Sequence, residues 1–289
     1  MKVLLTGAFG NIGTNALKKL LEQGHQVRCF DLKTKVNERT ARRFRGQIEV
    51  VWGDVRRPDD VAAAVHDQEV VIHLVFIMPP ASEDRPEWAR EINVGGTHNL
   101  LNAMRTLSSP PKILFSSSLS VFGNTQHKPP PRTVSDPVQP MDNYTHHKVE
   151  CEKLLQESGL DWTILRFGVV PPMSLGGFNP KMFDIPLDTR MEFAHPRDVG
   201  LAIANAVSCE EVWGKILLVG SDPSGQLYYR DFVGRMMNAM GVGMLPDQAF
   251  GSAPSYTDWM DTTESQRLLQ YQQHSFEDFV REITSLLGY

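Results

Sequence analysis

Tyr144 and Lys148 lie four residues apart in a stretch that is predicted to begin a helix. This spacing places both side chains on one helical face, one turn apart. An ammonium group beside a phenol stabilises the phenolate, so we expect Lys148 to lower the pKa of Tyr144. Such a tyrosine can donate a proton to a substrate oxygen or accept one from it. Two residues on a half-exposed helix face would show the same spacing, so the pair alone does not define a site.

A second group of reactive residue types follows the apolar run at residues 113–115, which is predicted to be a buried strand. Serine occupies positions 116, 117, 118 and 120. In an open parallel sheet, ligands bind outside the carboxyl ends of the strands. The serines are therefore candidates to hold a substrate oxygen, with an ordinary polar loop as the alternative.

The first 31 residues have the order strand, glycine-rich turn, amphipathic helix and strand. In the turn, Gly7 allows a sharp change of direction, and Gly10 allows backbone N–H groups to approach a pyrophosphate. Gly13 allows the helix and the strand to pack closely. Asp31, at the end of the second strand, can accept hydrogen bonds from ribose hydroxyls and repel a 2′-phosphate. The segment predicts NAD as cofactor rather than NADP, although two lysines at positions 33 and 35 lie close by.

The run Thr6-Gly7-Ala8-Phe9-Gly10-Asn11-Ile12-Gly13 resembles the extended short-chain dehydrogenase/reductase family, in its NAD-dependent epimerase/dehydratase group. That family has Thr-Gly-x-x-Gly-x-x-Gly at this place. The resemblance implies an α/β fold with a Rossmann-like, doubly wound, mostly parallel sheet of seven strands. It also implies a homodimer, formed by two long helices predicted at about residues 86–107 and 144–157.

The resemblance implies roles for four residues. Tyr144 would be the general acid and base, assisted by Lys148. The run Val121-Phe122-Gly123 matches the family's Val-Tyr-Gly except at Phe122, and this alignment makes Ser118 the residue that holds the reacting oxygen. Asn93 begins a match to Asn-Val-x-Gly-Thr and would hold Lys148 through water or backbone. A buried asparagine bonded to a neighbouring strand is a compatible alternative for Asn93.

Further contacts are implied at the strand ends. Asp54 and Val55 would contact adenine, although Asp54 could serve only the turn. Bulky residues follow the fourth strand where the family has small ones, which indicates a narrower or more apolar mouth. The implied cofactor contacts are Gly7, Gly10, Asn11, Ile12, Gly13, Asp31, Asp54, Val55, Leu74, Val75, Asn93, Tyr144, Lys148 and Gly168. The implied substrate contacts are Phe76, Met78, Ser118 and His195, the last of which is equally well explained as a helix-entry residue.

Three functions remain open. The first is an NAD-dependent dehydrogenase or reductase of a free sugar, a sugar acid or a small alcohol. The second is a nucleotide-sugar epimerase or dehydratase. Val169 stands where a galactose epimerase has an asparagine that contacts uridine diphosphate, and the segment after Pro172 is short, so both count against this function. Arginines at positions 190, 197 and 230 could still bind an anion. The third is a non-catalytic NAD-sensing regulator, which would not need Ser118, Tyr144 and Lys148.

Composition limits the partners and the location. The net charge is −5 with scattered Lys and Arg, which argues against nucleic-acid binding. Three widely spaced cysteines indicate reduced thiols, and no Cys/His spacing predicts a metal. The longest apolar stretch, at residues 70–78, is too short to span a bilayer, and the chain opens directly into a strand, so we expect a cytoplasmic protein.

We expect residues 1–170, continued by about 195–220, to form an NAD-binding Rossmann domain. Residues 171–194 and 221–289 would form a small substrate-binding lobe.

Overall fold

The computed structural model describes residues 1–173 and 180–286. Seven parallel strands form one sheet in the order β3-β2-β1-β4-β5-β6-β8, which confirms the predicted doubly wound fold. Their bounds are β1 Lys2–Thr6, β2 Gln26–Asp31, β3 Glu49–Trp52, β4 Val70–His73, β5 Lys112–Ser118, β6 Trp162–Phe167 and β8 Ile216–Val219. The strand order reverses between β1 and β4, and a crevice at such a point is where ligands bind in this class of fold.

Helices cover both faces of the sheet because β1, β4, β5 and β6 are apolar on both sides. One face is covered by α1 (Asn11–Glu22), α8 (Pro196–Ser208) and α10 (Thr263–Leu269). The other is covered by α3 (Pro58–Val65), α6 (Gly96–Arg105) and α7 (Asn143–Gln156). Shorter elements are α2 (Lys35–Arg42), α4 (Ala81–Asp84), η2 (Leu119–Phe122), η3 (Pro180–Asp184), η4 (Glu210–Val212), η5 (Pro223–Gly225) and η6 (Asp247–Ala249).

The helix predicted over residues 86–107 is interrupted. It consists of α5 (Pro86–Arg90), a π-helical segment η1 (Glu91–Gly95) and α6. Asn93 lies in the middle of η1 and is fully buried. π-helical turns are rare and occur frequently at functional sites, so the interruption directs attention to the side chain of Asn93.

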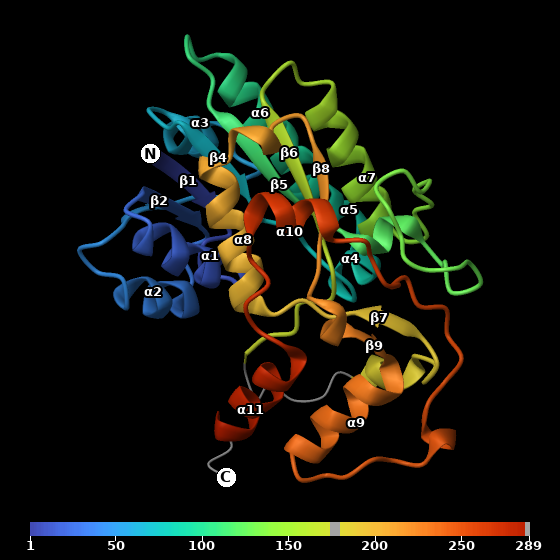
Figure 1. Cartoon of the computed structure of the whole chain (residues 1–289). Helices are drawn as coiled ribbons and strands as arrows, with labels where there is room; N and C mark the ends of the chain where they lie inside the picture. Colours follow the sequence, from blue (N-terminus) through green and yellow to red (C-terminus); the bar gives the residue numbers. More distant parts are fainter. Residues whose placement is uncertain (174–179, 287–289) are drawn as a thin grey trace.

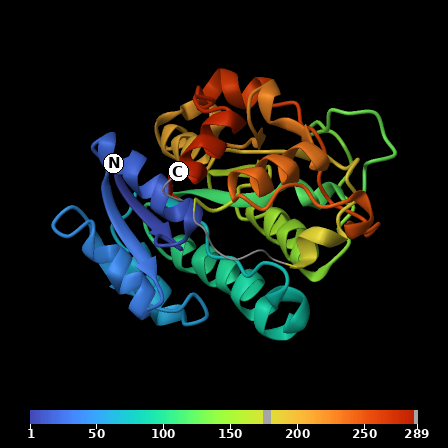
Figure 2. The ribbon, with the colours of Figure 1, turned by 90° about the horizontal axis from the view of Figure 1, so that it is seen from below.

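A smaller layer of elements lies beyond the carboxyl ends of the strands, at the bottom of Figure 1. It contains the antiparallel pair β7 (Arg190–Glu192) and β9 (Gln226–Tyr228) with the helices α9 (Tyr229–Ala239) and α11 (Phe276–Leu286). Phe193, Phe276 and Phe279 belong to its own apolar core. We call these four elements the lobe, and Figure 2 views the molecule from this side.

One helix within the stretch assigned to the lobe packs elsewhere. Leu269 of α10 and the following Tyr271 are buried in the core that α1 and α8 form against the sheet. Among the described residues, no helix is long and apolar enough to cross a bilayer.

Candidate active site

The glycine-rich turn has the geometry that its sequence predicts. Gly7 has a φ of +66°, in the region that favours glycine, and its N–H donates to the Phe30 carbonyl. A Cβ on Gly13 would lie 2.2 Å from the Gly7 carbonyl oxygen, so only glycine allows α1 to pack this closely on the turn. Gly10 and Asn11 are exposed at the start of α1. The free N–H groups there form a positive end that suits a pyrophosphate.

Asp31 lies at the end of β2 and is tied to the same turn. Its carboxylate accepts hydrogen bonds from the Phe9 N–H (3.0 Å), the Leu32 N–H (2.8 Å) and the Asn37 side-chain amide (3.0 Å). Burial raises the pKa of Asp31 above its ordinary value, while the two backbone hydrogen bonds lower it. A carboxylate is therefore fixed beside the helix end that would bind a pyrophosphate.

The predicted adenine contacts are engaged within the protein. The Asp54 carboxylate forms an ion pair with Arg56, and the Arg56 backbone N–H also donates to it. Val55 is 4% exposed and packs under Gly96, where a Cβ would lie 2.8 Å from the valine side chain. Asp54 thus serves its own turn, and its contact with adenine stays a prediction.

Tyr144 and Ser118 meet at the carboxyl edge of the sheet. Both residues line the same two cavities, and the Ser118 hydroxyl is hydrogen-bonded to that of Ser120 at 2.5 Å. Burial raises the pKa of Tyr144 to about 12, and the nearby Ser118 hydroxyl lowers it by less. The expectation that Lys148 lowers this pKa is therefore wrong for the protein without cofactor. Its phenol is protonated at neutral pH.

The position of Lys148 gives the reason. Its ammonium lies 3.5 Å from the centroid of the Phe76 ring and donates to the Ser116 carbonyl, while the centroid of the Tyr144 ring is 5.7 Å away. Lys148 is 2% exposed, and this burial lowers its pKa to about 7. Phe76, one of the bulky residues that follow the fourth strand, thus makes a cation–π contact with Lys148 through its ring.

Asn93 holds the segment after β4. Its side-chain oxygen accepts from the Ile77 N–H (2.6 Å), and its amide donates to the Ile77 carbonyl (3.0 Å). The same amide lies 3.3 Å from Nδ1 of His147. Asn93 is thus a buried asparagine bonded to the segment that follows β4, and its contact with Lys148 through water or backbone stays a prediction.

Glu83 is a positioning residue that sequence analysis did not identify. Its carboxylate accepts from the Asn143 N–H (3.1 Å), the Asn143 side chain (2.9 Å) and the Tyr144 N–H (3.2 Å). It therefore lies at the positive N-terminus of α7, where a carboxylate is favourable. No local motif marks this contact, because Glu83 is 61 residues before Tyr144 and faces it only after folding.

We expect Glu83→Ala to lower stability by about 1–2 kcal/mol, since three donors and a helix end lose a charged acceptor. The amides of residues 143 and 144 should also exchange hydrogen faster, which a loss confined to α4 would not cause. Glu87→Ala is the matched control, because Glu87 is exposed on the next helix. Thermal unfolding and hydrogen exchange of both variants measure the effect. Equal exchange rates in the two variants would remove Glu83 from this role.

Two cavities meet at Tyr144. One, of about 290 Å³, runs along the glycine-rich turn and reaches Lys148. The other, of about 700 Å³, opens between the sheet and the lobe. Both are lined by Met78, Ser118, Tyr144, Gly168 and Val170. The predicted residues Phe76 and Leu74 line only the first cavity.

His195 lies outside both cavities. It is fully buried, and its Nδ1 accepts from the Arg197 N–H at the start of α8. The predicted substrate contact of His195 is thus wrong, because the side chain caps a helix. Folding also brings His195 beside Asp198 and His274. Each of the three residues offers one atom that could bind a metal ion, and these three atoms lie within 4.8 Å of one another.

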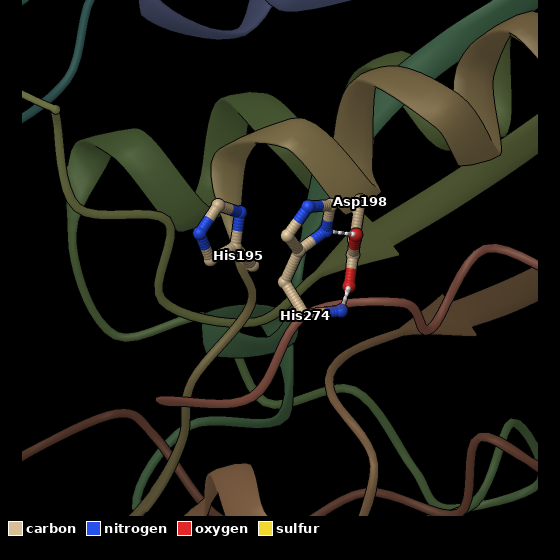
Figure 3. A group of neighbouring side chains, drawn as sticks. All are labelled: His195, Asp198 and His274. Carbon is tan, nitrogen blue, oxygen red and sulfur yellow. Dashed lines mark hydrogen bonds and ion pairs between the residues drawn. The ribbon is translucent and has the colours of Figure 1, made fainter. Parts of the chain in front are cut away.

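The geometry of this group does not suit a metal ion. Figure 3 shows His274 bonded to Asp198 while the His195 ring lies alongside. The two rings are stacked, with centroids 4.6 Å apart and planes 19° apart. An ion in the plane of one imidazole would lie off the plane of the other. The Asp198 carboxylate instead accepts backbone N–H groups of Gln273 and His274, which fastens the segment before α11 to α8.

The fold and the glycine-rich turn define a dinucleotide-binding α/β protein of the Rossmann class. The model of the NAD dependent epimerase/dehydratase family matches residues 3–183, and the chain belongs to this family. This confirms the family that the sequence motifs indicated.

Curated relatives match part of the chain. The 3β-hydroxysteroid dehydrogenase/Δ5→4-isomerase of Mycobacterium tuberculosis is 31% identical over 166 residues, which cover 55% of this chain and 44% of the relative. The CDP-paratose 2-epimerase of Salmonella typhi is 33% identical over 132 residues, or 44% of this chain and 39% of the relative. The chain thus spans about half the length of these relatives or less.

Solved structures resemble the whole chain. The UDP-glucose 4-epimerase of Thermotoga maritima, solved with UDP-glucose, is 19% identical, with a TM-score of 0.83 and coverage of 100% of this chain and 99% of that one. A short-chain dehydrogenase/reductase superfamily protein from Agrobacterium tumefaciens, solved with NAD, is 20% identical, with a TM-score of 0.82 and coverage of 100% and 97%. At such identities the likeness shows the fold alone.

Proposed function

We propose that the protein is an NAD-dependent oxidoreductase that interconverts a hydroxyl and a carbonyl group, with Tyr144 as acid and base. The observation that carries this proposal is the placement of Ser118 and Tyr144, both of which line the two cavities where these meet. A substrate in the larger cavity and a dinucleotide in the smaller one would both border this pair.

The residues present fit a dinucleotide. Gly7 and Gly13 allow the tight turn and the close packing of α1, and the exposed start of α1 at Gly10 offers N–H groups to a pyrophosphate. Asp31 would accept from the adenosine ribose, and Lys148 would face the other end of the dinucleotide. When bound, NAD would supply or take up the hydride.

The protonation state of Tyr144 suits reduction of a carbonyl. With a pKa of about 12, its phenol carries a proton at neutral pH and can donate it to a carbonyl oxygen. The Ser118 hydroxyl, which lines the same two cavities, would hold the same oxygen. Lys148, with a pKa of about 7, is partly protonated at neutral pH.

A nucleotide-sugar epimerase or dehydratase is the second candidate, and the similarity to a CDP-paratose 2-epimerase favours it. A non-catalytic NAD-sensing regulator is the third, and the presence of Ser118, Tyr144 and Lys148 together counts against it.

An experiment separates these functions. The purified protein is denatured, and any dinucleotide that is released is identified by mass spectrometry. NAD held at near one per chain would favour an epimerase or dehydratase, whereas a site that binds NAD reversibly would favour a dehydrogenase or reductase. A protein that binds no dinucleotide would refute the proposal.

Replacing Asp31 tests the cofactor preference. In Asp31→Asn we expect the preference for NAD over NADP to fall about tenfold, because the charge that repels a 2′-phosphate is lost. Asparagine keeps an oxygen that can accept from the Phe9 N–H, but its amide nitrogen would face the N–H groups of Leu32 and Asn37, so thermal unfolding of the variant is measured as well. Calorimetric titration with NAD and NADP measures both affinities. Asp67→Asn is the control, since its side chain is 61% exposed on another loop, and an equal change in both variants would refute the role of Asp31.

The division into a Rossmann domain and a substrate-binding lobe, the homodimer and the cytoplasmic location stay predictions. The apolar core of the lobe supports the first of these, because a separate core is what distinguishes a substructure of this kind.

A further inference from the structure

The larger cavity has a polar end and an apolar end. Ser118, Ser120, Asp142 and Tyr144 line it where β5 ends and α7 begins. The remaining lining, apart from Ser255 and Thr257, is mainly aliphatic, aromatic and thioether side chains, and the lobe supplies many of them. Those from the lobe and the segments beside it include Met182, Ile185, Met191, Phe232, Met236 and Ile283. Methionine side chains adapt to the shape of an apolar ligand.

The charge of this lining is negative. Asp142 is the charged residue among the described lining residues, and its carboxylate also caps α7 through the Thr145 N–H. A diphosphate entering the cavity would therefore meet a carboxylate and no described cation. Sites for phosphates instead provide arginine, lysine or free backbone N–H groups.

The three arginines that could have bound an anion are engaged elsewhere. Arg190 pairs with Asp258 at 2.7 Å, Arg197 with Glu282 at 2.7 Å, and Arg230 with Asp247 at 2.9 Å. These arginines are absent from the described lining of the cavity. The pair between Arg190 and Asp258 is the most buried of the three, with side chains 15% and 1% exposed.

We propose that the substrate is an uncharged, largely apolar ketone or the corresponding secondary alcohol. Its oxygen lies at Ser118 and Tyr144, and its carbon skeleton fills the lobe side of the cavity. In reduction, the carbonyl carbon gains a hydride from NADH, the oxygen gains the proton of Tyr144, and the products are the alcohol and NAD⁺. This assignment rests on the proposed function. It names an apolar ketone or alcohol as the substrate in place of the sugar that the sequence analysis predicted.

A homologous series of ketones tests the assignment. The full chain is saturated with NAD⁺, which prevents turnover of a ketone, and is titrated by calorimetry with 2-hexanone through 2-decanone and separately with UDP-glucose. Each added methylene is expected to tighten binding about fourfold, as burial of a CH₂ group predicts. UDP-glucose is expected not to bind.

A variant locates the ligand. Met236→Lys places a charge in the apolar end and is expected to weaken 2-decanone binding by roughly tenfold or more, since burying an unpaired charge is costly. NAD⁺ binding should be unchanged. Met244→Lys is the control, because Met244 is 38% exposed in the same part of the chain and outside the cavity lining. If Met236→Lys does not fold, Met236→Ala should still weaken 2-decanone binding several-fold.

The outcomes separate this inference from the proposed function. A flat series, or UDP-glucose bound more tightly than every ketone, would overturn the apolar substrate while intact NAD⁺ binding leaves the proposed function standing. Ketone binding that Met236→Lys and Met236→Ala leave unchanged would also overturn it. A wild-type chain that binds no NAD⁺ would refute the proposed function and this inference together.

Discussion

Tyr144→Phe is expected to lower kcat by about 10²–10⁴-fold, the usual contribution of a positioned acid or base. The variant loses only a hydroxyl. The ring keeps its edge-on contact with Phe76, whose centroid lies 5.6 Å away, so the fold should persist. Affinity for NAD should change little, because the phenol would act on the substrate oxygen. Steady-state rates of NADH oxidation with 2-decanone and calorimetric NAD titration measure the two effects.

Tyr228→Phe is the matched control for this experiment. Tyr228 is 45% exposed on β9 and lies outside the lining of both cavities. Its variant should keep the rate of the wild type. Full activity of Tyr144→Phe would show that Tyr144 is not the acid and base. A loss of NAD affinity with an unchanged kcat would show that Tyr144 binds the cofactor instead.

Glu152→Gln is expected to destabilise the fold by about 3–5 kcal/mol, because the buried cation of Arg166 loses the negative charge that pairs with it. Glu152 and Arg166 form an ion pair at 2.7 Å with side chains only 6% and 4% exposed. The Ser117 hydroxyl also donates to this carboxylate, and Nη1 of Arg166 already lacks a partner. Denaturant unfolding of the full chain measures the change.

The same helix supplies the control. Glu150 of α7 pairs with Arg90, but these side chains are 39% and 53% exposed. Glu150→Gln should therefore cost less than about 1 kcal/mol. Similar losses in the two variants would show that burial does not determine the strength of these pairs in α7.

The parts of the site that follow from sequence are those that local geometry determines. Gly7 and Gly13 have their predicted roles because a positive φ and a close helix–turn approach are properties of a few consecutive residues. The order of strands and helices was likewise predictable, since buried parallel strands are continuous apolar runs. The sequence also placed Ser118 and Tyr144 at one sheet edge, because both follow or flank a strand end.

Contacts between distant segments were not predictable. Phe76 covers the ammonium of Lys148 from a segment 72 positions earlier, and this contact together with burial overturned the expected effect of the lysine on Tyr144. The anchoring by Glu83 and the pairing of Arg190 with Asp258 have the same origin. His195 was misplaced because a residue before a helix can face a cavity or cap the helix, and spacing does not distinguish the two.

The π-helical segment η1 has a consequence for comparing this chain with its relatives. A π-helical turn holds one residue more than an α-helical turn. A relative whose helix is α-helical throughout would thus lack one residue between Arg90 and Gly96, and each residue turns a helix by about 100°. An ungapped alignment would then match buried positions of α5 with exposed positions of the relative. A single-residue gap inside this helix, which alignment scoring normally penalises, is what keeps Asn93 opposite its structural equivalent.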